Sequence, residues 1–188
     1  MNYLMDIIIK DGKIFDGVGN PWFKADIGVE DGKIIEVGRL SSTRADRKIN
    51  ASKLVVCPGF IDIHSHSDLQ LISNPTMDAK VYQGVSTELN GNCGTSPAPL
   101  IGRMKEQYLS SQKQTNVEDR WSTVKEYFQI LEKRGHATNT ATLLGYGNVR
   151  VAVLGMDSRT PNNLELDLMK ALIGQGMENG LFGLSTGL

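Results

Sequence analysis

The hydrophobic pattern of this 188-residue chain changes at Pro58-Gly59. Before this point, short apolar runs alternate with turn residues, which is typical of a small β unit. After it, short apolar runs alternate with longer stretches that have the spacing of amphipathic helices, which is typical of parallel strands joined by helices. We therefore expect two domains, residues 1–58 and residues 59–188, of which the second has an α/β fold.

Two Asp-Gly pairs punctuate the first domain. Asp11-Gly12 and Asp31-Gly32 each lie between apolar runs, and this dipeptide favours type I′ turns because both central residues of such a turn have positive φ. The sequence therefore predicts two β-hairpins over residues 6–38. The polar segment 41–50 is expected to be a loop, and the apolar run 54–57 closes the domain. Two hairpins bury too little surface to be stable alone, so further strands or a partner domain are required.

Four short apolar runs alternate with helical patterns in the second domain. The expected strands are 60–64, 85–89, 140–144 and 181–185, and the expected helices are 74–83, 117–134 and 163–179, with a polar loop at 94–116. Such alternation predicts a parallel sheet covered by helices. A closed barrel of eight such units needs about 250 residues, so the sequence predicts the N-terminal half of a (β/α)8 TIM-like barrel.

The charge balance and the cysteine content exclude several classes of protein. The chain has 20 Lys and Arg against 21 Asp and Glu, so no basic surplus favours nucleic acid or an acidic membrane as a partner. No apolar stretch approaches the roughly 20 residues that span a bilayer, and Asp6 interrupts the N-terminal run too early for a secretory signal. With only Cys57 and Cys93 the chain is no disulfide scaffold, and we expect reduced thiols and a cytoplasmic location.

Two histidines lie at the end of the first expected strand of the second domain. His64 and His66 are two residues apart, so on a strand their side chains lie on the same face. They would lie at the carboxyl end of that strand, where parallel barrels place their active sites. Two imidazoles in this position can bind one zinc ion at about 2.0–2.1 Å. The alternative is a pair of exposed loop histidines that bind nothing.

A cysteine follows the second expected strand. Cys93 lies between Gly91 and Gly94, at the same edge of the predicted sheet as the two histidines. A thiolate and imidazoles together suit Zn²⁺. The flanking glycines favour a shaped loop over the alternative, a small buried apolar side chain. The other cysteine, Cys57, lies in an apolar run and is expected to be buried in the core.

Four polar side chains near these residues have roles that the sequence leaves open. Asp62 can support a metal site from below or form hydrogen bonds in the barrel floor. Asp68 can orient His66 or cap the following loop, and we favour the cap. A lone strand carboxylate such as Glu88 is more often solvated or paired with a charge than functional. Asn92 is expected to shape its turn rather than to contact a substrate.

Other polar residues are expected to be structural. His136 precedes the third strand and therefore lies at the opposite edge of the sheet from His64. Arg150 is expected to form a salt bridge at the start of a helix rather than to bind a substrate carboxylate. Ser185 and Thr186 lie at an edge of the sheet, where no neighbouring group would activate a nucleophile.

Two segments of the chain carry a family resemblance. They are Phe60-Ile-Asp-Ile-His-Ser-His-Ser-Asp68 and Gly84-Val-Ser-Thr followed by Gly91-Asn-Cys-Gly-Thr-Ser-Pro-Ala-Pro99. In these segments the chain resembles the amidohydrolase superfamily and, within it, the N-acyl-D-amino-acid deacylase (D-aminoacylase) branch. The resemblance covers essentially the whole chain. The runs around the Asp-Gly pairs resemble the family's small β-sandwich domain, which implies that residues 1–58 form part of that domain.

The Gly-Asn-Cys-Gly motif at 91–94 is more specific than His-x-His, which marks only the superfamily. Most members of the superfamily bridge two metal ions with a carboxylated lysine from the fourth strand, and residues 181–188 contain no lysine. In the deacylase branch a cysteine takes the bridging role, and Cys93 matches its position. One departure is Gly145-Tyr146-Gly147, where the family usually has Gly-His-Gly. Tyrosine is a poor zinc ligand, so this change affects the surroundings of the site or the substrate pocket.

The resemblance implies a zinc centre and a reaction. His64 and His66 would hold one metal position, and Cys93 would contribute to the tighter, adjacent one. Two further histidines, an aspartate and the general base would come from later strands, beyond residue 188. The full-length parent would hydrolyse a linear amide, an N-acyl-D-amino acid, to a carboxylate and a free D-amino acid. A zinc-bound water would attack the acyl carbonyl.

With an incomplete site, the 188-residue chain itself is expected to be inactive. Its half barrel would leave an open parallel edge and an uncovered apolar face, which favour self-association. Two alternatives to the deacylase remain. One is an amidohydrolase that opens a cyclic amide, as dihydropyrimidinases and hydantoinases do, against which Cys93 and the lack of lysine in 181–188 both argue. The other is a non-catalytic remnant of the fold.

Overall fold

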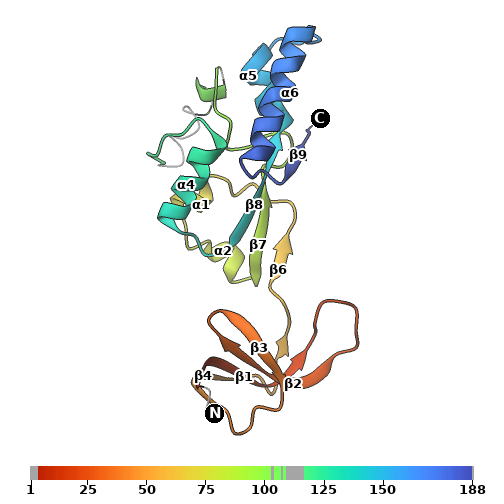
Figure 1. The fold of residues 1–188 in the computed structure, drawn as a ribbon, viewed down its shortest axis with the longest axis vertical. Coiled ribbons are helices and arrows are strands. Elements are labelled where there is room, and N and C mark those ends of the chain that lie inside the picture. Colours follow the sequence, from red (N-terminus) through yellow and green to blue (C-terminus); the bar gives the residue numbers. More distant parts are fainter. Residues whose placement is uncertain (1–3, 103, 107, 109–116, 188) are drawn as a thin grey trace. The chain divides into compact units, whose positions relative to one another are not determined.

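The computed structural model describes residues 4–102, 104–106, 108 and 117–187 (Figure 1). The chain divides into two compact units, the first ending at Pro58 and the second starting at Gly59. Both units contain a β-sheet, and the second also contains helices, so the fold is mixed α/β. None of the described helices is long and apolar enough to cross a membrane.

The first unit is a five-stranded sheet. Its strands are β1 (Leu4–Ile14), β2 (Phe23–Glu30), β3 (Lys33–Gly38), β4 (Arg44–Asn50) and β5 (Val55–Val56). The order across the sheet is β3-β2-β1-β4, and β5 also pairs with β1. β2 is antiparallel to both β1 and β3, whereas β4 and β5 run parallel to β1.

The two Asp-Gly pairs have different structures. Asp31 (φ 49°) and Gly32 (φ 70°) join β2 to β3 in the predicted two-residue turn. The predicted hairpin at Asp11-Gly12 is wrong, because β1 continues through this pair and its register with β2 shifts there in a β-bulge. A Cβ atom on Gly12 would lie 2.8 Å from a Val56 methyl carbon. The approach of β5 therefore requires glycine at this bulge.

Two further expectations for the first unit are wrong. The polar segment 41–50 contains β4, whose backbone pairs with β1 although its sequence carries little apolar signal. Cys57 is exposed rather than buried. It follows the last residue of the two-residue strand β5, so the apolar run ends in a short paired segment instead of entering the core.

The second unit contains a parallel sheet of four strands in the order β6-β7-β8-β9 (Figure 1). The strands are β6 (Phe60–Asp62), β7 (Val85–Asn90), β8 (Asn139–Gly145) and β9 (Gly183–Ser185). All four match predicted strands in position. β6 ends two residues earlier than expected, and the His64 amide donates to the Asp62 carboxylate instead of joining the ladder.

Helices accompany these strands, and their side chains build one core. The helices are α1 (Gln70–Ser73), α2 (Asp78–Val81), α4 (Val124–Arg134), α5 (Tyr146–Leu154) and α6 (Asn163–Glu178). Buried members of the core include Leu71, Ile72, Trp121, Tyr127, Leu131, Leu144, Val149 and Met169. Because Leu144 of β8 lies against Gly176 of α6, this face of the sheet is the one that the helices cover.

The helix predictions are partly correct. The helix expected at 163–179 is confirmed as α6. The helix expected at 117–134 begins only at Val124, because Thr123 and Glu126 form a capping box there. The helix expected at 74–83 is reduced to α2, and Met77 precedes it with φ 48°. The helices α1 and α5 were not predicted, and residues 103, 107 and 109–116 of the expected loop lie outside the described residues.

A buried carboxylate organises the first unit. Asp26 on β2 accepts hydrogen bonds from the Lys10 ammonium (2.7 Å), the Asp11 amide of the bulge (2.7 Å) and the Leu40 amide (2.9 Å). Burial opposes its charged form, but these three donors outweigh burial and lower the pKa of Asp26 from 3.8 to about 2. Asp26 therefore fixes both the bulge and the segment after β3.

Asp26→Asn is expected to lower the free energy of unfolding of this unit by about 2 kcal/mol at neutral pH, because it loses hydrogen bonds to a charged acceptor. Amide hydrogen exchange in β1 and β2 measures the change. Because the folded pKa is the lower one, the stabilisation is complete above pH 4 and is lost as the pH falls from 4 to 2. The exposed Asp46→Asn is the control and should stay within about 0.5 kcal/mol. Equal effects of the two substitutions would contradict this role.

Candidate metal centre

His64 and His66 lie in the segment that follows β6. Their ring centroids are 5.4 Å apart and the rings are inclined by 60°. Both side chains are exposed, whereas Ser65 and Ser67 between and after them are buried. The alternation of exposed and buried side chains that is typical of a strand thus continues beyond the last paired residue of β6. Both imidazoles lie on the exposed side.

Two hydrogen bonds donated by backbone amides hold this segment against β7. The Ser65 amide donates to the carbonyl of Leu89 (3.0 Å), and the Ser67 amide donates to the Asn90 side-chain oxygen (2.8 Å). The Ser65 and Ser67 hydroxyls also contact each other at 2.8 Å. The histidines are therefore carried by a loop that is fixed at both serines rather than by a free surface segment.

Cys93 lies in a tight loop after β7. Gly91 (φ 74°), Cys93 (φ 53°) and Gly94 (φ 75°) all have left-handed backbone conformations. A Cβ atom on Gly91 would lie 2.1 Å from the Leu143 carbonyl oxygen, and one on Gly187 would lie 2.4 Å from the Cys93 carbonyl oxygen. The backbones of three segments therefore meet here, and only glycine fits at these contacts.

Side chains from three segments anchor the same loop. Asp68 accepts from the Gly91 amide (3.0 Å). Asn92 donates to the carbonyls of Ser65 (3.1 Å) and Leu89 (2.7 Å). Ser185 of β9 accepts from the Gly94 amide (3.1 Å) and donates to the Gly91 carbonyl. The predicted turn-shaping role of Asn92 is confirmed. Asp68 bonds this loop instead of capping the helix that follows it, α1, so the favoured expectation for it is wrong.

Asp68 also has an altered acidity. Burial raises the pKa of Asp68 from 3.8 to about 6, and hydrogen bonds from its own amide and from the Gly91 amide only partly offset this effect. The backbone carbonyl of Asp68 accepts from the hydroxyl of the buried Tyr127 on α4 (2.9 Å). The residue thus connects the helix layer to the loop that carries Cys93.

These two loops bring together three side chains of the types that bind metal ions. The His64 Nε2 atom is 3.2 Å from the Cys93 Sγ atom. Ligand atoms of His64, His66 and Cys93 all lie within 4.8 Å of one another, and all three side chains are exposed. Two donors of one tetrahedral zinc ion are roughly 3.3–3.6 Å apart when its bonds are about 2.0–2.3 Å. Two imidazoles and a thiolate at this spacing fit zinc.

A partly buried cluster of charged side chains lies beneath the histidine segment. Asp62 accepts from the His64 amide (3.1 Å) and from the Lys80 ammonium (2.5 Å). Glu88 is fully buried and accepts from Ser65 (2.7 Å) and Thr138 (3.0 Å). The Lys80 Nζ atom is 3.5 Å from Glu88. Of the two alternatives expected for Glu88, a solvated or a paired charge, the structure shows the paired one.

The ionisation of this cluster follows from its contacts. Burial opposes the charged form of Glu88, but hydrogen bonds from Ser65, Ser67 and Thr138 and the charge of Lys80 together lower its pKa. The hydrogen bond from Lys80 lowers the pKa of Asp62. Burial opposes the charged form of Lys80 too, yet its two carboxylate partners raise its pKa.

Sequence reasoning missed Lys80. Asp62 and Glu88 occupy paired positions on β6 and β7, and two carboxylates on one covered face of a sheet require a cation nearby. That requirement was the available signal. It could not identify Lys80 itself, because the position of α2 against the sheet depends on the tertiary fold.

Three other polar residues considered in the sequence make structural contacts. His136 precedes β8, and its Nδ1 atom contacts the Thr138 carbonyl, so the structural role expected for it is confirmed. Arg150 donates to the carbonyls of Asp157 and Arg159 instead of forming the expected salt bridge. Tyr146 starts α5 and packs against the core.

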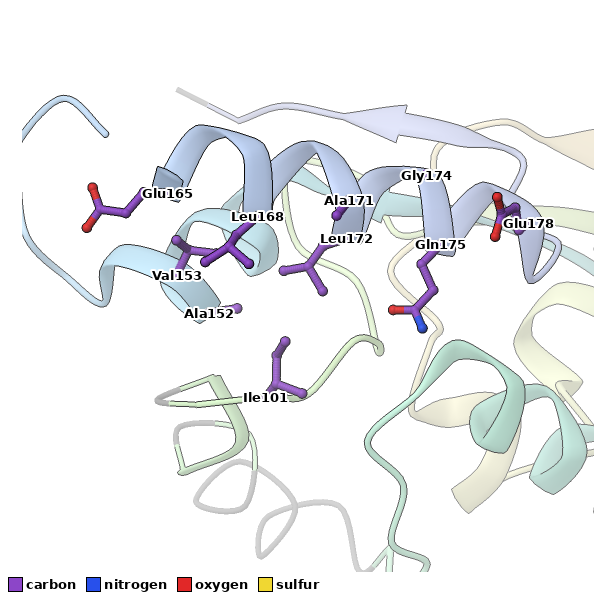
Figure 2. Close-up of a pocket in the computed structure, with 10 residues that line it drawn as sticks. All are labelled: Ile101, Ala152, Val153, Glu165, Leu168, Ala171, Leu172, Gly174, Gln175 and Glu178. Carbon is purple, nitrogen blue, oxygen red and sulfur yellow. The ribbon is translucent and has the colours of Figure 1, made fainter. Parts of the chain in front are cut away.

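A separate hollow of about 770 Å³ lies between α5, α6 and Ile101 (Figure 2). Val153, Leu168 and Leu172 give it an apolar wall, and Glu165 and Glu178 also line it. None of its lining residues is a candidate metal ligand. The chemistry-bearing residues therefore lie on the open edge of the sheet and not in this hollow.

Comparison with known proteins supplies a family context. The sequence profile of the amidohydrolase family matches residues 47–187. N-acyl-D-glutamate deacylase from Alcaligenes xylosoxydans xylosoxydans is 34% identical over 190 residues, which cover 100% of this chain and 38% of that protein. D-aminoacylase from the same organism is 34% identical over 182 residues, which cover 97% of this chain and 37% of that protein.

A solved structure is similar at the level of the fold. It is that of N-acyl-D-glutamate deacylase from Bordetella bronchiseptica, in complex with zinc and a phosphonate inhibitor that mimics the tetrahedral intermediate. The TM-score is 0.87 at 34% identity, over 99% of this chain and 39% of that one. The present chain spans less than two fifths of the length of each of these relatives.

Gly91→Ala is expected to lower the free energy of unfolding of the second unit by more than about 3 kcal/mol, because the new Cβ atom would collide with the Leu143 carbonyl. The fluorescence of the buried Trp121 during urea unfolding measures the loss. Gly135→Ala is the control: its φ is also positive (68°), but no atom lies within 4 Å of the added carbon. That variant should lose only about 1–3 kcal/mol from backbone strain. Similar losses in both variants would show that the crowding at Gly91 is unimportant.

Proposed function

Because this chain belongs to the amidohydrolase family, we propose that its full-length parent is a zinc-dependent hydrolase of linear amides. The proposed substrate is an N-acyl-D-amino acid, and the products are a carboxylate and a free D-amino acid. The proposal rests on one observation above all: Cys93 lies within 4.8 Å of His64 and His66. The names of two similar proteins, an N-acyl-D-glutamate deacylase and a D-aminoacylase, support the substrate class.

The finer architecture is part of this proposal. Residues 1–58 would be part of a small β-sandwich domain, and residues 59–188 would be the first half of a (β/α)8 barrel. Parallel order of β6 to β9 supports the second statement. So does the exposure of Ile61, Ile63 and Leu184, since these apolar side chains would be covered in a closed barrel.

Within the site, the chain's own residues have separate tasks. His64 and His66 would hold one metal position through their imidazoles, and Cys93, in the bridging role, would share its thiolate between that position and the adjacent one. A zinc ion held there would supply a water that ionises near neutral pH, and the ion itself would polarise the acyl carbonyl. Asp62, Asp68 and the serines of the histidine segment would hold the two ligand loops in place through hydrogen bonds. The general base and the remaining ligands are proposed to come from residues beyond 188.

The chain by itself is proposed to be inactive and to self-associate. Of its three histidines, His136 lies at the other edge of the sheet, so His64, His66 and Cys93 are left to bind metal without the further ligands that the resemblance implies. Phe182 of the segment before β9 is exposed, as is Ile61 of β6. Such apolar groups beside open strand edges favour association. The cytoplasmic location remains a prediction from the cysteine content.

Assays of the full-length protein on N-acetyl-D-amino acids, their L-enantiomers and hydantoins test the function. We expect turnover of the D-series and none of the cyclic amides. Cys93→Ser should lower kcat/KM by more than about 100-fold, because a lost ligand costs more than the 10–100-fold typical of residues behind the ligands. Cys57→Ser is the matched control, since Cys57 is also an exposed free thiol, and it should leave kcat/KM unchanged.

Two results would contradict the proposal. Hydrolysis of hydantoins without hydrolysis of N-acyl-D-amino acids would favour the cyclic amidohydrolase. A full-length protein without any hydrolytic activity in the presence of zinc would favour a non-catalytic remnant.

A further inference from the structure

We propose that Lys80 is a positioning residue for the metal centre, which holds the histidine segment and the cysteine loop at their working separation. This inference rests on the proposed metal centre. Lys80 lies on α2, outside both ligand loops, and its side chain is only 23% exposed. It is not itself a metal ligand, because its ammonium group is occupied by three oxygen partners.

The three partners of Lys80 come from both strands that lead to the site. Its Nζ atom is 2.5 Å from Asp62 of β6 and 3.1 Å from the Ser65 hydroxyl. The third partner is Glu88 of β7, at 3.5 Å. Since β6 leads to the two histidines and β7 leads to Cys93, one ammonium group connects the supports of all three candidate ligands.

These contacts constrain the backbone of His64 from both sides. The Asp62 oxygen that Lys80 does not bind accepts the His64 amide (3.1 Å). On the other side, Ser65 gives its hydroxyl proton to Glu88 (2.7 Å) and its amide to Leu89 (3.0 Å). A change in the position of Lys80 would therefore be transmitted through one hydrogen bond on each side of the ligand.

Electrostatic repulsion makes the ammonium group necessary. Asp62 and Glu88 are paired across β6 and β7, and Glu88 is fully buried. Two carboxylates in adjacent paired positions repel each other, and the repulsion is stronger when one of them, here Glu88, has no contact with water. Without Lys80 this repulsion would lower the stability of the sheet. Asp62 and Ser65 would in addition lose the donor that connects them, immediately below the segment that bears the histidines, and this second loss does not depend on the charge of Glu88. Lys80 would thus set the separation between His64 and Cys93.

Titration of the whole 188-residue chain with Co²⁺ tests this role. The thiolate-to-cobalt charge-transfer band reports Cys93 as a ligand, and the d–d bands report the coordination geometry. Lys80→Met is expected to weaken Co²⁺ binding by about 10–100-fold, as changes behind metal ligands typically do. The matched control is Lys10→Met, which removes a lysine of similar exposure (26%) from its ion pair with Asp26 in the first unit. Its Co²⁺ affinity should equal that of the wild type.

A double variant separates positioning from simple stability. Lys80→Met alone leaves Glu88 buried without its cation, so a loss of stability is expected. Lys80→Met combined with Glu88→Gln removes both charges, and its melting temperature should recover toward that of the wild type. Its affinity for Co²⁺ should nevertheless stay low, because Asp62 and Ser65 remain without the ammonium group. Lys80→Arg, which keeps a cation, should restore more affinity than methionine does.

The outcomes distinguish this inference from the proposed function. Wild-type Co²⁺ affinity and spectra in the double variant would overturn the positioning role and leave the metal centre intact. Equal weakening by Lys10→Met would also overturn it, since the effect would then be one of general stability. A wild-type chain that binds no Co²⁺, or a charge-transfer band that persists in Cys93→Ser, would overturn the metal centre itself and this inference with it.

Discussion

The contact between Gly91 and the carbonyl oxygen of Leu143 determines where Cys93 lies. There is no space for a side chain at Gly91, because an added Cβ atom would be 2.1 Å from that oxygen. The chain therefore turns through left-handed conformations at Gly91, Cys93 and Gly94, and Ser185 fixes the turn by hydrogen bonds at both ends. A cysteine held in this way by backbone contacts has little freedom, which suits a metal ligand that must meet partners from another loop.

His64 and His66, the proposed partners of Cys93, are positioned by electrostatic interactions instead. The histidine segment sits over the cluster of Asp62, Lys80 and Glu88, and its serines point into that cluster while its histidines point away from it. Buried charges in such a cluster are costly unless every one of them is paired. Here each carboxylate has the ammonium group and at least one further donor. One loop is thus positioned by steric crowding and the other by charge, and the two meet at the carboxyl ends of adjacent parallel strands.

The sequence predicted the parts of this structure that depend on local pattern. The strands β6 to β9 follow apolar runs, the Asp31-Gly32 turn follows its dipeptide, and His64, His66 and Cys93 follow from their place after strands. It failed where partners distant in the chain decide the outcome. Asp11-Gly12 has the same dipeptide, yet β5 and the Asp26 carboxylate make it a bulge. The polar strand β4 exists because its backbone pairs with β1, and Lys80 reaches the site only through the packing of α2. The start of α4 was also missed, although Thr123 followed three residues later by Glu126 is a local capping-box pattern that could have predicted it.

X-ray absorption spectroscopy of the zinc-loaded chain shows whether the two histidines and Cys93 form one metal centre. We expect one sulfur at about 2.3 Å from zinc, together with nitrogen ligands at about 2.0–2.1 Å. The sulfur shell should disappear in Cys93→Ser and remain in Cys57→Ser. A zinc ion surrounded only by nitrogen and oxygen, or a sulfur shell that survives the loss of Cys93, would rule out this centre.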